Sequence, residues 1–287
     1  MSTLKLDGSG SGGALPNLLI IGAQKCGTTA LHSYLARHPE VSMSTPKELN
    51  FFIDDRREGN WHRGADWYGR HFDPEFQVRG ESSPNYTVDP VLPGVATRAA
   101  RLVPDAKLIF MVRDPVERVR SGYVHHYANR RERRPLREAV LDPASSYVMR
   151  SRYHHQLSSW LEHFPMERVL VVSQDDLRLT RRPSLQRVWR FLGIRENVSR
   201  AGFRKQRLKT EKLRRKTVVG RYVSRHVSAG QWHRIENAQL LGWHPLARPI
   251  EQPELDDDVR SRLEEMLRED AERFRALTGL AFEDWSV

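Results

Sequence analysis

Three runs of mostly apolar residues stand out along the chain and predict buried β-strands. They cover residues 18–21, 107–112 and 168–172, and each has the length of a strand. None approaches the roughly 18–20 apolar residues that a membrane span needs, so we expect no transmembrane segment.

Between these runs, apolar residues recur at the three- and four-residue spacing of amphipathic helices. Leu31, Tyr34 and Leu35 follow the first run at this spacing, and their helix should end before Pro39. Residues 80–84 (GESSP) are predicted to form a turn. Further helices are predicted at 61–72, 92–103, 150–164, 183–192 and 256–277, and from Pro115 onward. Strands that alternate with helices indicate one α/β domain, a central parallel sheet flanked by helices.

The loop between the first strand and the first helix, residues 22–29 (GAQKCGTT), has the strongest chemical signal in the chain. A strand, a loop bounded by glycines and a helix N-terminus together form a cradle for an anion. Backbone N–H groups and the helix dipole favour a phosphate there.

The same loop nearly matches the G-x-x-x-x-G-K-[ST] loop of nucleotide triphosphatases, with Gly22 and Gly27 as its two glycines. The motif places its lysine after the second glycine, where this chain has Thr28, whereas Lys25 lies inside the loop. A lysine inside the loop lies over the first phosphate and its leaving-group oxygen, and not over the β- and γ-phosphates of ATP. A purely structural glycine-rich turn is the alternative interpretation.

A second anchor follows the second apolar run. Arg113 ends that predicted strand, and Ser121 lies eight residues later, about two turns into the next helix. The guanidinium offers a fork of donors that suits a phosphate, and the serine adds a hydroxyl. In the structural alternative, Arg113 pairs with Asp114 or Glu117.

Composition narrows the class of protein. The net charge of +11 on 287 residues indicates a polyanionic partner, such as a nucleotide, a nucleic acid, an anionic glycan or a membrane surface. The single cysteine, Cys26, excludes an intramolecular disulfide and a cysteine-based zinc site, and a reducing cytoplasm is the simplest setting. Residues 1–16 are predicted to be a flexible leader rich in Gly and Ser, and residues 17–287 the folded domain.

The two anchors together resemble the superfamily of sulfotransferases that use 3′-phosphoadenosine-5′-phosphosulfate (PAPS). In that family, a strand–loop–helix with K-x-G-T-[TR] binds the 5′-phosphosulfate. A later strand that ends in R-D-P, with a serine eight residues on, binds the 3′-phosphate. Residues 152–177 and 189–194 are similar to two further family segments, so the resemblance covers 17–195 well and the last third loosely. It implies a fold like that of the P-loop kinases.

Within the superfamily, the loop and residues 47–52 (KELNFF) are more similar to heparan sulfate and other glycan-modifying enzymes and their bacterial relatives. Their E-x-H-F-F segment maps the catalytic base onto Glu48, with Asn50 in place of the histidine. Where they have a lysine in E-K-[TS]-P, this chain has Ser82, and Lys47 is the candidate replacement. His125 matches a histidine that contributes to the site in some relatives.

The resemblance implies transfer of a sulfuryl group from PAPS to a hydroxyl or amine, with 3′,5′-adenosine bisphosphate (PAP) as product and no metal required. Lys25 would neutralise charge on the bridging oxygen, and Glu48, or His125 as second candidate, would accept the acceptor's proton. The nucleotide would be bound by Lys25, Cys26, Gly27, Thr28 and Thr29 at its 5′ end, the Cys26 side chain having no required role, and by Arg113, Ser121, Lys205 and Arg207 at its 3′-phosphate.

Three other functions remain open from the sequence. A P-loop-type kinase would use ATP and magnesium, with residues 171–177 (VVSQDDL) as the metal-binding strand end. A basic nucleic-acid-binding protein is compatible with the charge, although no helix-turn-helix, zinc or RNA-recognition signature is present. A sulfotransferase-like protein could also bind the nucleotide without catalysis. The acceptor is open among a glycan, a glycolipid and a hydroxylated natural product.

Overall fold

A parallel sheet forms the centre of the computed structural model, which describes residues 13–54, 59–198 and 252–287 and short pieces at 214–216, 222–223, 226–227 and 247–249. The sheet has five strands in the order β2-β3-β1-β4-β5, and all neighbours run parallel. The strands are β1 (Leu18–Gly22), β2 (Val41–Met43), β3 (Val78–Ser82), β4 (Lys107–Val112) and β5 (Val169–Ser173). The α/β class predicted from the sequence is confirmed.

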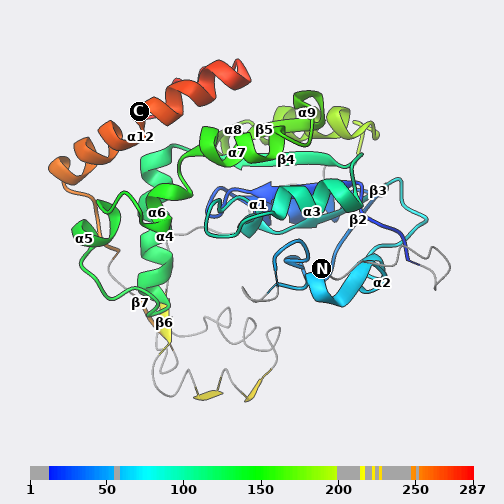
Figure 1. Ribbon diagram of the computed structural model, residues 1–287, viewed down its shortest axis with the longest axis horizontal. Helices are drawn as coiled ribbons and strands as arrows, with labels where there is room; N and C mark the ends of the chain where they lie inside the picture. Colours follow the sequence, from blue (N-terminus) through cyan, green and yellow to red (C-terminus); the bar gives the residue numbers. More distant parts are fainter. Residues whose placement is uncertain are drawn as a thin grey trace.

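Helices cover both faces of this sheet and one of its ends (Figure 1). The C-terminal helix α12 packs against α4 and α7. The α-helices are α1 (Thr28–Leu35), α2 (Gly64–Gly69), α3 (Val95–Leu102), α4 (Pro115–Ala128), α5 (Leu136–Val140), α6 (Ser146–Met149), α7 (Tyr153–Leu161), α8 (Gln174–Leu179), α9 (Arg181–Leu192) and α12 (Asp257–Thr278). The remaining elements are the 3₁₀-helices η2 (Trp61–Arg63), η3 (Pro84–Tyr86) and η4 (Met166–Arg168) and a separate antiparallel pair, β6 (Arg214–Lys216) with β7 (Ala247–Pro249).

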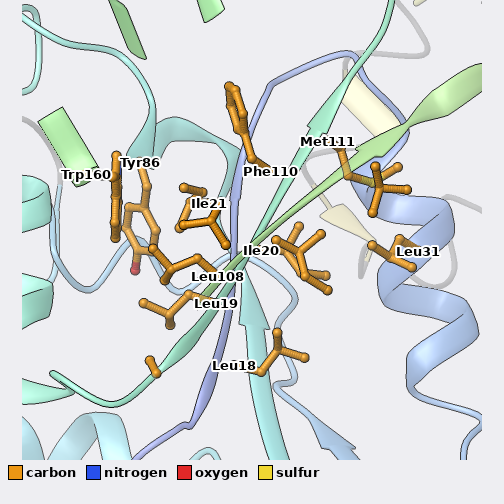
Figure 2. Close-up of a cluster of buried hydrophobic side chains, with 14 of the residues drawn as sticks. Leu18, Leu19, Ile20, Ile21, Leu31, Tyr86, Leu108, Phe110, Met111 and Trp160 are labelled. Atoms are coloured by element: carbon orange, nitrogen blue, oxygen red, sulfur yellow. The ribbon is translucent and has the colours of Figure 1, made fainter. Parts of the chain in front are cut away.

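The core lies on both sides of β1, whose residues are all buried. In Figure 2, Leu19 and Ile21 point toward Tyr86 and Trp160, whereas Ile20 points toward Leu31 of α1. Successive side chains of a strand alternate between its two faces, so an uninterrupted apolar run fits a strand that is covered on both.

The structure also corrects the sequence prediction for β2 and β3, on one side of β1. Residues 80–84 were expected to form a turn, and this is wrong, because β3 runs through Ser82 and η3 begins only at Pro84. The short strand β2 carried no recognised signal either. Since β3 reads VRGES, it lacks an apolar run, yet Glu81 and Ser82 are completely buried. The buried Glu81 carboxylate accepts hydrogen bonds from Tyr68, Ser83 and Tyr86, which periodicity does not reveal.

This topology determines where a ligand can bind. The carboxyl ends of parallel strands lie at one edge of a sheet, and loops that follow neighbouring strands meet there. The β1–α1 loop, Arg113 after β4, the segment after β2 and Ser83 after β3 all lie at this edge.

Candidate functional site

The β1–α1 loop adopts the backbone of an anion cradle. Gly27 is the N-cap residue of α1 in the left-handed region, with φ of 86°. A Cβ atom there would lie 3.2 Å from the Gln174 side chain, so both conformation and space favour glycine. Lys25 is also left-handed, with φ of 72°, which is uncommon for a residue with a side chain. The first N–H groups of α1 have no intrahelical partner and point at this loop.

The electrostatics of the loop favour an anion. Burial, and then the charges of Arg118 and Arg113, lower the pKa of the Lys25 ammonium. Three cations therefore lie close together, and neither arginine forms an ion pair with a carboxylate among the described residues. A phosphate or sulfate group placed at the loop would relieve their mutual repulsion.

Arg118 of α4 holds the β1–α1 loop through a hydrogen bond to its backbone. Its side chain is completely buried in α4, and its Nε donates to the Gln24 carbonyl at 3.1 Å. Nη1 donates to the Tyr147 carbonyl at 2.7 Å. One guanidinium thus connects the peptide group before Lys25 to α6. Burial lowers the pKa of Arg118.

A cavity of about 400 Å³ opens above the loop. It gathers Lys25, Gly27, Thr28, Thr29, Glu48 and His125 from the predicted site residues, and it is also lined by Lys47, Asn85, Arg131, Gln174, Arg178 and Arg181, among others. These six residues belong to three segments that are far apart in the chain and meet at one cavity, and their functional roles stay predictions.

Lys47 and Glu48 enter this cavity from the segment after β2. Lys47 Nζ lies 2.7 Å from Glu48 Oε1 and donates to Thr28 Oγ1 at 3.4 Å. The lysine thus bridges the carboxylate and the first turn of α1. The Ser82 N–H donates to the Lys47 carbonyl at 3.2 Å, so Lys47 lies beside the position at which the similar enzymes have their second lysine.

His125 lines the cavity from α4. Burial, followed by the charge of Lys25, lowers the pKa of its imidazole to about 4. The ring is therefore neutral near pH 7, although a pKa this low makes it a weak proton acceptor.

Arg113 and Ser121, the second predicted anchor, are not among the residues that line the cavity. Arg113 Nε and Ser121 Oγ are both buried and have no partner among the described residues. Asp114 instead caps α4 by accepting from the Glu117 N–H at 2.8 Å, and Glu117 pairs with Arg260 at 2.8 Å. The alternative in which Arg113 pairs with Asp114 or Glu117 is therefore not what the structure shows.

Cys26 is a predicted residue of the loop that does not line the cavity. The Cys26 side chain is buried away from the cavity, where its sulfur lies 3.4 Å from the Tyr153 hydroxyl, and burial raises the pKa of the thiol. It fixes the loop to α7 and is not a reactive group. Lys205 and Arg207 lie outside the described residues.

Sequence reasoning missed several cations of the site. Arg131, Arg178 and Arg181 line the cavity, but they lie outside the predicted helices and strands, where no spacing marked them. Arg118 had a usable signal: an arginine between Val116 and Val119 on a helix lies among buried positions, where a charge needs a specific partner.

Comparison with known proteins identifies the family. Residues 15–275 match the family model described as the sulfotransferase domain. The chain belongs to the sulfotransferase family. This assignment accounts for the displaced lysine of the loop and favours a sulfuryl-transfer interpretation over the kinase and nucleic-acid-binding ones.

Two curated relatives show which sulfotransferases this one is similar to. It is 33% identical over 202 residues to the bifunctional heparan sulfate N-deacetylase/N-sulfotransferase 1 of Caenorhabditis elegans, a match that covers 64% of this chain and 22% of that protein. It is 34% identical over 196 residues to the heparan sulfate glucosamine 3-O-sulfotransferase 3A1 of Mus musculus, covering 64% of this chain and 47% of that protein. The chain thus spans less than half the length of either relative.

The fold also has a counterpart among solved structures. The sulfotransferase from Alicyclobacillus acidocaldarius superposes with a TM-score of 0.69 at 24% identity, covering 96% of this chain and 100% of that one. Among the described residues of our sulfotransferase, no helix is long and apolar enough to cross a membrane.

Proposed function

We propose that this sulfotransferase moves the sulfuryl group of PAPS to a hydroxyl or amine of a glycan-like acceptor. The observation that carries the proposal is the cavity itself, in which Lys25, Thr28, Lys47 and Glu48 converge above an anion cradle. Membership of the sulfotransferase family and similarity to heparan sulfate enzymes support it.

The nucleotide would be held at two ends. The backbone N–H groups of Gly27, Thr28 and Thr29 would donate hydrogen bonds to the 5′-phosphate at the N-terminus of α1. Arg113 and Ser121 would supply donors to the 3′-phosphate, and their lack of partners among the described residues supports this role. Lys205 or Arg207 would add a further cation to the 3′-phosphate.

The chemical step is an in-line displacement at sulfur. The acceptor oxygen or nitrogen forms a bond to sulfur, the bond from sulfur to the bridging oxygen breaks, and PAP leaves. Lys25 would stabilise the charge that grows on the bridging oxygen, with Lys47 on the transferring group. Glu48 would take the acceptor's proton, with His125 as the second candidate.

The similar enzymes suggest the acceptor class. One is named for N-sulfation and the other for 3-O-sulfation of heparan sulfate, so a glycan amine or hydroxyl is the proposed nucleophile. The cations Arg131, Arg178 and Arg181 at the cavity suit an anionic chain. A cytoplasmic setting and a domain that begins at residue 17 remain predictions from the sequence.

Calorimetric titration with PAP beside Mg·ATP tests the donor. We expect micromolar or tighter binding of PAP and little heat from Mg·ATP. The reverse preference would overturn the proposal and restore the kinase interpretation. Release of PAP from PAPS in the presence of N-deacetylated heparosan, which offers free amines and hydroxyls, tests the acceptor.

The variant Lys25→Ala tests the role of the loop lysine. It should reduce turnover by about a hundredfold or more, since one lost electrostatic contact to the transition state costs on the order of 3 kcal/mol. PAP affinity should fall less. Lys107→Ala is the control. Lys107 donates to the Phe191 carbonyl and is the first residue of β4, so it lies at the end of the strand that is far from the cradle. Full turnover by Lys25→Ala would contradict the assignment.

A further inference from the structure

Glu81 is a completely buried carboxylate with no basic partner among the described residues. It lies near the end of β3 and accepts hydrogen bonds from the Ser83 hydroxyl at 2.6 Å, from the Tyr86 hydroxyl at 2.6 Å and from the Tyr68 hydroxyl. The Leu49 backbone N–H is a fourth donor. Burial raises the pKa of this carboxyl, and the hydrogen bonds from its four donors oppose that shift. An ionised carboxylate has about four lone-pair sites, which four donors can fill.

Three of these contacts lead to one loop. The Leu49 N–H reaches Glu81 directly. The Asn50 N–H donates to the Ser83 hydroxyl at 3.0 Å, and the Phe52 N–H donates to the Tyr86 hydroxyl at 3.3 Å. Each hydroxyl therefore accepts from the loop and donates to Glu81, so backbone groups of residues 49–52 depend on one carboxylate.

The same loop begins with Lys47 and Glu48. The Lys47 carbonyl accepts from the Ser82 N–H at 3.2 Å and from the Ser44 hydroxyl at 3.2 Å. Its far end is fixed by packing, since the Phe51 ring stacks on Tyr68 with centroids 4.0 Å apart. Glu48 itself has an exposed side chain whose only polar contact within the described residues is with Lys47, so its position depends on the backbone that carries it.

We infer that Glu81 is a positioning residue that holds the loop carrying Lys47 and Glu48 against the end of β3. The inference rests on the proposed roles of these two residues, which Glu81 itself does not touch. Placement matters to such a step, because a displacement of about 1 Å can cost a hundredfold in rate.

A carboxylate does this better than an amide of the same size. All four of its neighbours donate, whereas the NH₂ group of glutamine needs an acceptor. In Glu81→Gln, a hydroxyl would have to turn and stop donating to residue 81, or the amide would clash with it. Either response weakens the connection between the loop and β3.

The experiment compares wild type with Glu81→Gln and with the milder Ser83→Ala, which removes one donor to Glu81 and the acceptor of the Asn50 N–H. Hydrogen exchange measures the Leu49, Asn50 and Phe52 amides, calorimetry measures PAP affinity, and PAP release from PAPS with N-deacetylated heparosan measures kcat. We expect these amides to exchange at least about tenfold faster in Glu81→Gln, kcat to fall by about tenfold or more, and PAP affinity to stay within about threefold.

Tyr86→Phe and Tyr68→Phe form a matched pair, because each removes one hydroxyl from Glu81 but only that of Tyr86 receives a loop N–H among the described residues. Tyr86→Phe should lower kcat more than Tyr68→Phe. Unchanged amide exchange in Glu81→Gln, or equal losses of kcat and PAP affinity, would overturn the inference. If wild type binds no PAP, the proposed function fails, whereas the exchange rates still decide whether Glu81 holds the loop.

Discussion

At the scale of single residues, the site is marked by polar groups without their usual partners. Ser121 Oγ and Arg113 Nε are buried and unpaired within the described residues, and Lys25 has a left-handed backbone. Buried polar atoms are nearly always satisfied in folded proteins, so these two atoms support the predicted role of Arg113 and Ser121 as donors to a phosphate. The sequence could locate these residues by spacing, but only the structure shows that they lack partners.

The two candidate bases can be separated by one substitution each. Glu48→Gln removes a group that accepts from Lys47, whereas His125→Gln removes a ring that is neutral at pH 7 because burial lowers its pKa to about 4. If Glu48 is the base, Glu48→Gln should lower kcat by about a hundredfold or more and His125→Gln by about tenfold or less. Kinetics of PAP release at saturating PAPS measure both.

The control for this pair is PAP affinity, which both variants should keep within about threefold if they act on the chemical step. A larger loss in His125→Gln than in Glu48→Gln would reassign the base to His125. Loss of PAP binding in Glu48→Gln would reassign that residue to a structural role through Lys47 and Thr28.

At the scale of elements, α4 organises much of the site. Arg118, Ser121 and His125 are spaced three and four residues apart, so they share one face of the helix. Pro115 at the first position and Asp114 as the cap fix where the helix begins, and thus which residues face the β1–α1 loop. This start was predictable from the sequence, and with it the positions of Ser121 and His125.

The elements that sequence reasoning missed are those that lack a local signal. The strand β3 contains a glycine and two charged residues, and it is stable in the core because Glu81 is satisfied by Tyr68, Ser83 and Tyr86. Such a network is a property of the folded chain, since two of its members lie in other segments. The apolar run of β4, by contrast, gave its exact bounds in advance.

Substitution of Arg118 tests the clamp on the loop. Arg118→Met removes donors to the Gln24 and Tyr147 carbonyls and one of three cations near the cradle. PAP affinity should fall by about tenfold or more, since a charge-assisted hydrogen bond contributes about 1.5–3 kcal/mol. Arg118→Lys should recover only part of it, because one ammonium lacks the planar fork that reaches both carbonyls. Calorimetry measures both variants.

Arg260→Met is the matched control for Arg118. It removes an arginine that also contacts α4, through Glu117 at 2.8 Å, but lies on α12 and away from the loop. Its PAP affinity should equal that of wild type within about twofold. Wild-type affinity in both Arg118 variants would contradict the clamp, and full recovery by lysine would assign the effect to charge alone.

At the scale of the whole molecule, three histidines with lowered pKa values link stability to pH. Burial lowers the pKa of His32, His125 and His126 to about 4 in each case, and neighbouring cations contribute to every shift. In the unfolded chain a histidine has a pKa of about 6.5. Between these values the unfolded state binds more protons than the native state, so the free energy of unfolding rises with pH across this window.

We therefore expect the protein to lose stability as the pH falls from about 6.5 toward 4, which urea unfolding at a series of pH values measures. His126→Gln isolates one contribution, because this ring contacts the Tyr147 hydroxyl at 3.1 Å and does not line the cavity. Between pH 7 and pH 5, the free energy of unfolding should fall less in His126→Gln than in wild type. The difference between the two losses should be about 1 kcal/mol after allowance for solvent screening. Parallel pH profiles would contradict the shifted pKa of His126.

PAP should flatten the dependence of wild-type stability on pH, since its phosphates favour the protonated form of His125. This flattening would link the charge of the whole protein to the nucleotide at its cradle.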